Sequence, residues 1–252
     1  MLQQTTRLSP TEISHRYQVG LALSEAEVLE AQRLRYRVFA EEMGARLPTR
    51  QAGVDQDVFD AFCHHLIVRD VDDGKVIGTY RILTPSAARR AGSYYSETEF
   101  DLVRLAHLRP RLVEIGRSCV DPSYRSGAVI TLLWSGLASF MRDGGYEHLM
   151  GCASIGMADG GHHAAGIYAK MEKHMAPLEY RVFPRCPLPL ERLEASPDAE
   201  LPPLLKGYLR AGAQVCGEPA WDPDFNTADL LLLLPLSRIS TRYARHFMER
   251  HD

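Results

Sequence analysis

The sequence predicts an α+β fold, a three-layer α/β/α domain with a central mixed, mostly antiparallel sheet. Short apolar segments typical of strands alternate with segments typical of helices, and a β-hairpin comes early in the series. Neither an internal repeat nor a clear linker divides the 252 residues, a length sufficient for one sizeable hydrophobic core. We expect a single domain over residues 1–252, with a C-terminal extension at about residues 184–252.

The composition indicates a cytoplasmic protein. Hydrophobic residues make up 45% and charged residues 24% of the chain, as in ordinary soluble proteins, and the net charge of −3 argues against nucleic-acid binding. The polar N-terminus lacks the features of a signal peptide, and the longest apolar run, Leu230–Leu236, is too short to span a bilayer. The five cysteines show no C-x-x-C spacing, so we expect reduced thiols.

The strand and helix signals can be placed in order along the chain. Tyr17–Leu23 alternates as a strand does, and Ser24 and Glu27 predict a capping box for a helix that runs to about Met43. The turn at residues 72–74 joins two predicted strands, 64–70 and 75–83. Beyond them we expect a polar connection at 84–98, strands at 113–120, 148–154 and 228–234, helices at 128–141, 167–174, 203–211 and 237–250, and an irregular Pro-rich stretch at 184–203.

The central feature of the sequence is a strand that leads through a turn into a helix. Strand 113–120 carries Glu114 and Arg117, and a turn containing Pro122 and Gly127 opens the helix. The free N–H groups and the positive dipole end of a helix start favour a bound phosphate. Because Glu114 beside it could take up a proton, the pairing indicates group transfer from a phosphate-bearing carrier.

Four separated motifs carry a resemblance to known proteins. The order of elements resembles the acetyltransferase-like fold called GNAT. The segments Leu34–Phe39, Asp57-x-x-Asp60, Gly78–Leu83 and Glu114-Ile-Gly-Arg117 resemble motifs of acyl-homoserine lactone synthases. The chain departs from those synthases at Ala45, where they have a tryptophan.

The C-terminal half is similar to a different family. Gly151–Ser154, Lys206–Arg210 and Cys216–Asp229 resemble the L-ornithine Nα-acyltransferases of ornithine-lipid synthesis, sometimes labelled hemolysin-like, and the resemblance covers roughly residues 20–248. It implies transfer of a 3-hydroxyacyl group from acyl carrier protein to the α-amine of L-ornithine, giving lyso-ornithine lipid. The donor would be the 4′-phosphopantetheine thioester of the carrier protein, and no permanently bound cofactor is expected.

The resemblance also suggests roles for the charged residues. Glu114 is the candidate general base; the alternative is a structural ion pair with Arg81 or Arg117. The candidate substrate-binding residues, which could equally form structural salt bridges where they are charged, are Arg35, Phe39, Asp57, Asp60, Arg81 and Arg117. In this hypothesis the arginines recognise an amino-acid carboxylate, and Asp57 and Asp60 receive the side-chain ammonium of ornithine.

The phosphate turn contains fewer glycines than the acetyl-CoA loop of this fold. This difference favours the single phosphate of a carrier-protein arm over coenzyme A. The candidate phosphopantetheine-binding residues are Cys119, Val120, Arg125, Ser126 and Gly127. As a nucleophile Cys119 has no activating neighbour in sequence, so a buried strand cysteine is favoured.

Metal binding is not expected, because His64-His65 and His162-His163 lack ligand spacing with other residues. Arg238, Arg242 and Arg245 form a basic stripe that suits acyl carrier protein or an anionic membrane surface, or is simply a solvated helix face. We therefore expect a cytoplasmic enzyme that can visit the inner face of the membrane. The alternatives are an acyl-homoserine lactone synthase, a transferase for another amino acid, and a non-catalytic lipid- or carrier-binding protein.

Overall fold

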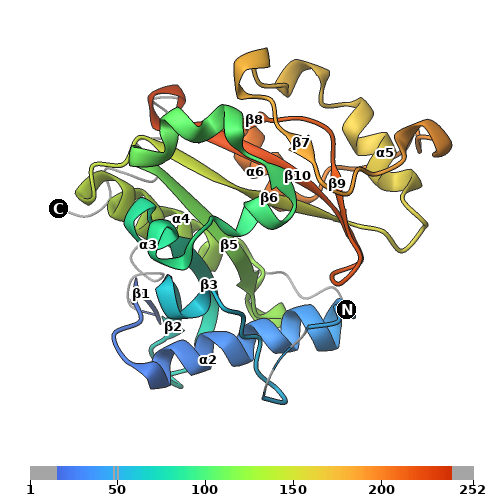
Figure 1. Ribbon diagram of the computed structural model, residues 1–252. Coiled ribbons are helices and arrows are strands. Elements are labelled where there is room, and N and C mark those ends of the chain that lie inside the picture. Colours follow the sequence, from blue (N-terminus) through green and yellow to red (C-terminus); the bar gives the residue numbers. More distant parts are fainter. Residues whose placement is uncertain (1–15, 48, 50, 240–252) are drawn as a thin grey trace. The chain divides into compact units, whose positions relative to one another are not determined.

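The computed structural model (Figure 1) describes residues 16–47, 49 and 51–239. The chain forms two compact units. The first contains the described residues up to Ile82 together with Gly116–Gly144; the second contains Leu83–Ile115 and the chain from Gly145 onward. Strand β5 (Leu112–Val120) begins in the second unit and ends in the first. The expected single domain stays a prediction.

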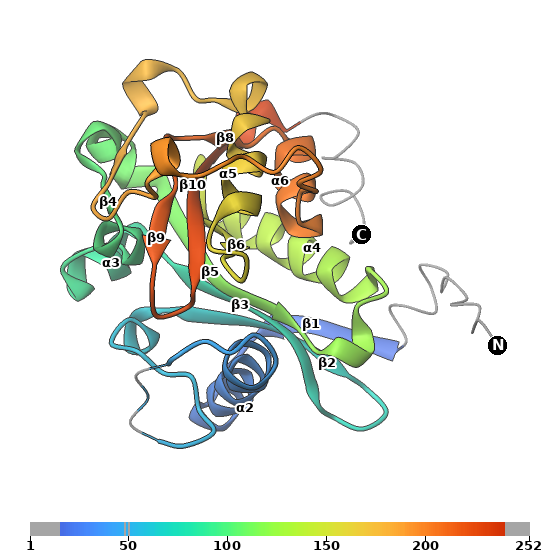
Figure 2. The same ribbon diagram turned by 90° about the vertical axis from the view of Figure 1, so that its right-hand side faces the viewer.

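The first unit is an antiparallel sheet with helices on both faces. β1 (Tyr17–Leu21) pairs with β2 (His64–Asp70), and β2 pairs with β3 (Val76–Leu83). Helices α2 (Glu25–Tyr36) and α4 (Ala128–Asp143) cover opposite faces of these strands (Figure 2). This is the layered arrangement that the alternation of apolar residues predicts.

Strand alternation on β2 determines which side chains meet each helix. Leu66 faces α4, where a methyl group placed on Gly136 would lie 3.1 Å from it. The neighbouring His65 points to the other face, with its Nε2 3.3 Å from the carbonyl oxygen of Asp60. The polar face of the sheet therefore lies on the side of α2.

The predicted start of α2 is confirmed. Ser24 Oγ accepts a hydrogen bond from Glu27 N at 3.3 Å, and the Glu27 carboxylate accepts one from Leu23 N at 2.8 Å. The helix ends near Met43 as expected, but its last turn, Arg37–Glu42, widens into a π-helix. Such wide turns often lie at functional sites.

The second unit is built on a mixed sheet. The first residues of β5 pair in parallel with β6 (His148–Gly156), and β6 pairs antiparallel with β10 (Thr227–Pro235). β10 also pairs with β8 (Gln214–Val215) and, as a hairpin, with β9 (Ala220–Asp222). The predicted α+β class with a mixed, mostly antiparallel sheet is confirmed.

Helices and a small ribbon complete the second unit. The helices are α3 (Pro85–Ala91), α5 (His162–Ala169) and α6 (Pro203–Ala211), and the ribbon is formed by β4 (Phe100–Asp101) and β7 (Phe183–Pro184). No helix within the described part of the chain is long and apolar enough to cross a membrane.

Three segments of this unit differ from the prediction or lie partly outside the described residues. The polar connection at 84–98 is wrong, because Thr84 caps α3 with its side chain and Pro85 occupies the first turn. The helix expected at 167–174 begins earlier, at His162, since Gly161 with a φ of 104° forms its N-cap. Of the expected tail helix, residues 240–250, including Arg242 and Arg245, lie outside the described residues; Leu236–Arg238 form a 3₁₀ turn.

Gly151 on β6 is required by close packing against β5. A methyl group placed on it would lie 2.4 Å from the carbonyl oxygen of Ile115, whereas one on Gly20 of β1 would meet nothing within 4 Å. We expect Gly151→Ala to lower the free energy of unfolding by about 1–3 kcal/mol, because backbone must move. Urea unfolding measures this, with Gly20→Ala as the control; equal stability of the two variants would contradict the packing argument.

Candidate active site

A buried network of arginines and aspartates lies in the first unit. Arg35 of α2, which is fully buried, donates from Nε to Asp55 Oδ2 at 2.7 Å and from Nη1 to Asp60 Oδ1 at 2.8 Å. Arg81 of β3 donates to Asp57 Oδ1 at 2.6 Å and to Asp60 Oδ2 at 3.1 Å. Arg117 of β5 contacts Asp55 and Asp57 at 3.3 and 3.2 Å. Three guanidinium charges thus face three carboxylates.

Within this network, Asp60 and Arg81 stabilise each other's charge. Burial alone would raise the pKa of Asp60, but the charges of Arg35 and Arg81 lower it below its usual range. Burial likewise opposes the charge of Arg81, and Asp57 and Asp60 overcome it, so that its pKa rises. The pKa of the adjacent His65 is lowered, chiefly by burial, which favours a neutral imidazole.

Arg117 lies in an unusual backbone conformation. Its φ of 50° is in the left-handed region, although it is neither glycine nor part of a turn. Such a conformation costs roughly 1–2 kcal/mol and persists only where surrounding contacts hold it. The ion pairs with Asp55 and Asp57 are contacts of that kind.

The carboxylate of Glu114 is held at a defined position in the second unit. Glu114 is buried in β5, and its Oε2 and Oε1 accept hydrogen bonds from the backbone N–H groups of Tyr95 and Ser96, both at 2.7 Å. Ser96 Oγ also donates to Oε1 and lies 3.5 Å from Cys152 Sγ on β6. These donors fix the orientation of the carboxylate.

The turn after β5 has the predicted form. Gly127, with a φ of 99°, is the N-cap of α4, and Thr131 donates to its carbonyl oxygen at 2.8 Å. Arg125 makes a two-pronged ion pair with Glu42 at 2.6 and 2.7 Å and donates to Val120 O. Burial raises the pKa of the Cys119 thiol to about 12, so the thiol stays protonated and is a poor nucleophile.

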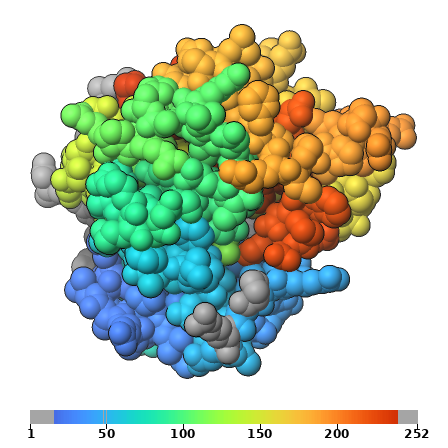
Figure 3. All heavy atoms as spheres, in the orientation of Figure 1, coloured from blue at the N-terminus to red at the C-terminus, as the bar shows by residue number. Residues whose placement is uncertain are grey.

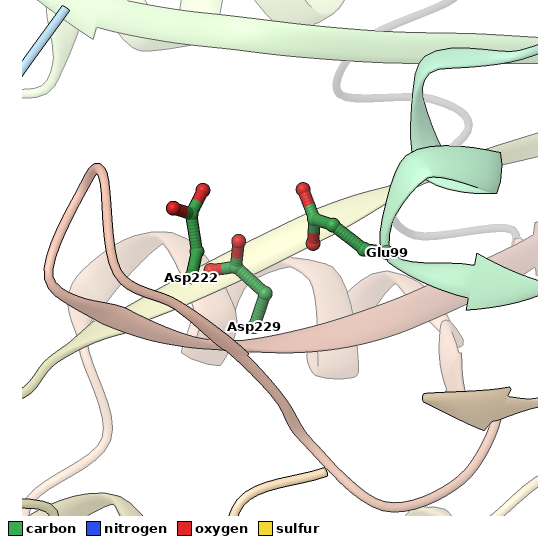
Figure 4. Close-up of side chains that lie close together, drawn as sticks. All are labelled: Glu99, Asp222 and Asp229. Atoms are coloured by element: carbon green, nitrogen blue, oxygen red, sulfur yellow. The ribbon is translucent and has the colours of Figure 1, made fainter. Parts of the chain in front are cut away.

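A group of acids that sequence reasoning did not single out lies in the second unit. Glu99 immediately precedes β4, Asp222 ends β9 and Asp229 is the third residue of β10, and their carboxylates point toward one another (Figure 4). One oxygen of each lies within 4.8 Å of the others. Asp222 and Asp229 lie within the segment Cys216–Asp229 that resembles the acyltransferase family, but Glu99 is far from them along the chain, so spacing alone does not bring the three together.

The structure therefore sorts the predicted site residues into groups. Arg35, Asp57, Asp60, Arg81 and Arg117 meet in one ionic network, joined by Asp55, which the sequence analysis did not include. Phe39 is buried in the π-helical turn. Cys119, Val120, Arg125, Ser126 and Gly127 form the strand end and turn, and Glu114 is held in the other unit. Their roles in substrate binding and catalysis stay predictions.

Asp60 is the residue whose loss should destabilise the network most. Asp60→Asn leaves the buried Arg35 without a full counter-charge, so we expect a loss of about 3–5 kcal/mol of unfolding free energy at neutral pH. The folded-state pKa of Asp60 is depressed, so its contribution is complete above about pH 4 and declines as the pH falls below the ordinary value for aspartate.

Urea unfolding at pH 7 and pH 3 tests this prediction. The difference between wild type and Asp60→Asn should shrink at the lower pH. Asp73→Asn, which removes an exposed ion pair with Lys75, is the matched control and should leave stability unchanged. An equal loss for Asp60→Asn at both pH values would contradict the electrostatic account.

Comparisons with solved structures support the fold. The structure is similar to BjaI, a CoA-dependent acyl-homoserine lactone synthase, with a TM-score of 0.56, 16% identity, and coverage of 93% of this chain and 88% of that one. FeeM, an N-acyl amino acid synthase from uncultured soil microbes, gives a TM-score of 0.55 at 14% identity, covering 88% and 91% of the chains. At such identities the likeness shows the fold alone.

Sequence comparisons are more specific. Residues 34–135 match the model of the acetyltransferase (GNAT) domain, which confirms the expected fold family. The L-ornithine N(alpha)-acyltransferase of Brucella abortus is 38% identical over 91% of this chain and 88% of its own length. That of Rhodobacter capsulatus is 35% identical over 93% and 95%. The chain therefore belongs to the L-ornithine Nα-acyltransferase family and is an acyltransferase of the GNAT fold.

Proposed function

We propose that this protein transfers a 3-hydroxyacyl group from acyl carrier protein to the α-amine of L-ornithine, giving lyso-ornithine lipid. The observation that carries the proposal is 35–38% identity, over at least 90% of the chain, to relatives named L-ornithine N(alpha)-acyltransferase. We place the reaction in the cytoplasm, with transient contact to an anionic membrane surface through which an amphiphilic product can leave.

Glu114 is the residue that we assign to proton removal. Attack of an amine on a thioester forms a C–N bond, releases the carrier thiol and leaves a proton that a base must accept. A carboxylate on a central strand, oriented by Ser96 and Tyr95, suits that task directly or through one water. The same hydrogen bonds also hold the turn at Tyr95–Thr98, so Glu114 stabilises the local structure in addition to its proposed role as base.

The start of α4 is the part of the chain that we assign to the phosphopantetheine arm. Backbone N–H groups after Gly127 and the positive dipole end favour a single phosphate diester. Val120 and Cys119 lead into this turn, and Ser126 adds a hydroxyl. The ion pair with Glu42 holds the guanidinium group of Arg125 at the turn.

Exposure decides which network residues a substrate can reach. The side chains of Arg35 and Asp60 are 0% and 2% exposed, whereas those of Arg117 and Asp57 are 11% and 20% exposed. We assign recognition of the ornithine carboxylate to Arg117, with the buried Arg81 holding Asp57 in place beside it, and packing beneath the acyl chain to Phe39. Arg35 and Asp60 act as positioning residues behind them.

The proposed reaction can be tested with purified protein. We expect 3-hydroxyacyl carrier protein and L-ornithine to yield N-acyl ornithine, identified by mass spectrometry, with acyl-CoA a poorer donor. Lysine, glutamine and S-adenosylmethionine serve as competing acceptors for the alternative reactions. Transfer to another amine would replace ornithine as acceptor, and a folded protein that binds the carrier without any transfer would rule out catalysis.

Replacing the proposed base should remove activity and leave the fold intact. We expect Glu114→Gln to lower kcat by roughly 10²–10⁴-fold, because an amide cannot accept the proton. Circular dichroism and gel filtration check the fold. Glu147→Gln, at an exposed ion pair with Arg111, is the control and should retain full activity. Unchanged kcat in folded Glu114→Gln would show that another group takes the proton.

A further inference from the structure

We propose that Glu99, Asp222 and Asp229 form the subsite that binds the side-chain ammonium group of the acceptor amino acid. The inference deepens the proposed function and rests on it, since it concerns how the same site selects a diamino acid over other amino acids. The three residues lie in the second unit, which also holds Glu114.

The group has three acceptors that converge on one point. Asp222 is held by hydrogen bonds from the backbone N–H groups of Asp224 and Phe225 at 2.8 and 3.1 Å. Asp229 is 4% exposed on β10, and Glu99 approaches from the opposite side (Figure 4). An ammonium group has three N–H donors, so three carboxylates that point inward match its hydrogen-bonding capacity.

The group lacks a positive charge of its own. Among the described residues, no lysine, arginine or histidine forms an ion pair with Glu99, Asp222 or Asp229. Burial and the charge of Asp229 raise the pKa of Glu99 to about 9, and burial raises that of Asp229. Without a ligand the group must hold protons; a bound cation would let its carboxylates ionise.

Thr227 gives a second, independent indication of a ligand. It lies directly opposite Asp222 in the β9–β10 register and two residues before Asp229, so all three side chains share one face. Thr227 is 2% exposed, and its Oγ1 has no hydrogen bond of ordinary geometry in the part of the chain described, although the hydroxyl lies close enough to Asp229 to lower the pKa of that carboxyl. A buried hydroxyl that lacks a well-formed hydrogen bond beside three acids is expected at a site for a polar ligand.

The proposed subsite lies on the same sheet face as the proposed base. Glu114 pairs with Met150 of β6, and Ser154, four residues further along, pairs with Asp229. Four residues correspond to about 13 Å along the strand. Ser96 Oγ, which donates to Glu114, lies 3.5 Å from Cys152 Sγ, two residues along β6 from Met150 and two before Ser154.

A short chain segment also joins the two places. Ser96, which donates to Glu114, accepts at its carbonyl oxygen a hydrogen bond of 3.2 Å from Glu99 N. An amino acid whose α-amine faces Glu114 can therefore extend its side-chain amine toward the acids.

The same group suits an ammonium better than a divalent ion. Calcium takes six to eight oxygen ligands, and magnesium keeps most of its waters in an octahedral shell. Three carboxylates provide only a few of the oxygen ligands that such an ion takes. An alkylammonium needs only the three acceptors present.

The group is also open to solvent on one side. Asp222 is partly exposed, and the tip of the β9–β10 hairpin, orange-red in Figure 3, lies on the molecular surface with Pro223 and Asp224 exposed. In contrast, Asp57 and Asp60, for which we expected this role from the sequence, already face Arg81, Arg35 and Arg117. The side chain of Asp60 is only 2% exposed, and Asp57 is held by two arginines, whereas Asp222 is partly exposed and has no cationic partner among the described residues.

The test compares L-ornithine with L-norvaline, which has the same carbon chain without the side-chain amine. Both are given to wild type, Asp222→Asn, Glu99→Gln and the control Asp224→Asn, a neighbouring exposed acid outside the group. We expect Asp222→Asn and Glu99→Gln to lose roughly ten- to hundredfold in kcat/KM for ornithine, mainly through KM, because a charged hydrogen bond is removed. The low activity with norvaline should not change.

Ligand binding measured without turnover separates the proposed subsite from the proposed acyl-transfer function. Isothermal titration of each variant with ornithine, norvaline and calcium or magnesium chloride is the second readout. Ornithine binding that Asp222→Asn abolishes would support the subsite even if no acyl transfer occurred, in which case only the proposed function fails. The subsite would be overturned if wild type acylated ornithine normally but the variants lost kcat/KM equally for ornithine and norvaline. Tight metal binding by wild type that Asp222→Asn abolishes would also overturn it.

Discussion

The buried guanidinium of Arg35 is the constraint on which the first unit depends. A charge removed from water is costly unless a partner of opposite sign is buried with it. Asp55 and Asp60 provide that partner, and Arg81 and Arg117 extend the pairing to β3 and β5. The network therefore ties helix α2, the loop before β2 and two strands to one another. It also supports the left-handed backbone of Arg117, three residues after Glu114.

The acids of the second unit lie in the opposite electrostatic environment. Glu99, Asp222 and Asp229 are brought together without an arginine in the described chain, and the pKa of Glu99 is raised rather than lowered. The same residue types thus have different consequences in the two units. Beside arginines, the pKa of Asp60 is lowered; without them, burial raises the pKa of Glu99, which the proposed ammonium ligand would oppose.

Local signals in the sequence predict much of the fold. The strand at His64–Asp70 and its hairpin partner follow from alternation and the Asp-Asp-Gly turn, and helix α6 agrees with its predicted ends at Pro203 and Ala211. Helix α3 was missed although Thr84, Pro85 and Gly92 are ordinary start and stop signals, because a small, polar composition suggested a loop. The π-helical turn has no comparable sequence signal.

The candidate site is only partly visible in the sequence. Motif spacing brings out Glu114, Arg117 and the phosphate turn, because these residues are neighbours in the chain. It cannot show that Ser96 orients Glu114, or that Glu99 faces Asp229, since both contacts depend on how distant segments pair. The balance of charges in each cluster, which decides whether an acid is structural or available, appears only in three dimensions.

The most direct measurement is the position of the acyl group on the product made from L-ornithine. If Glu114 receives the proton of the α-amine while Glu99, Asp222 and Asp229 hold the side-chain ammonium, tandem mass spectrometry should find the acyl group on the α-nitrogen only. A product acylated on the side-chain nitrogen, or a mixture of the two, would contradict the account, because the amine assigned to the acidic group would then be the one that reacts.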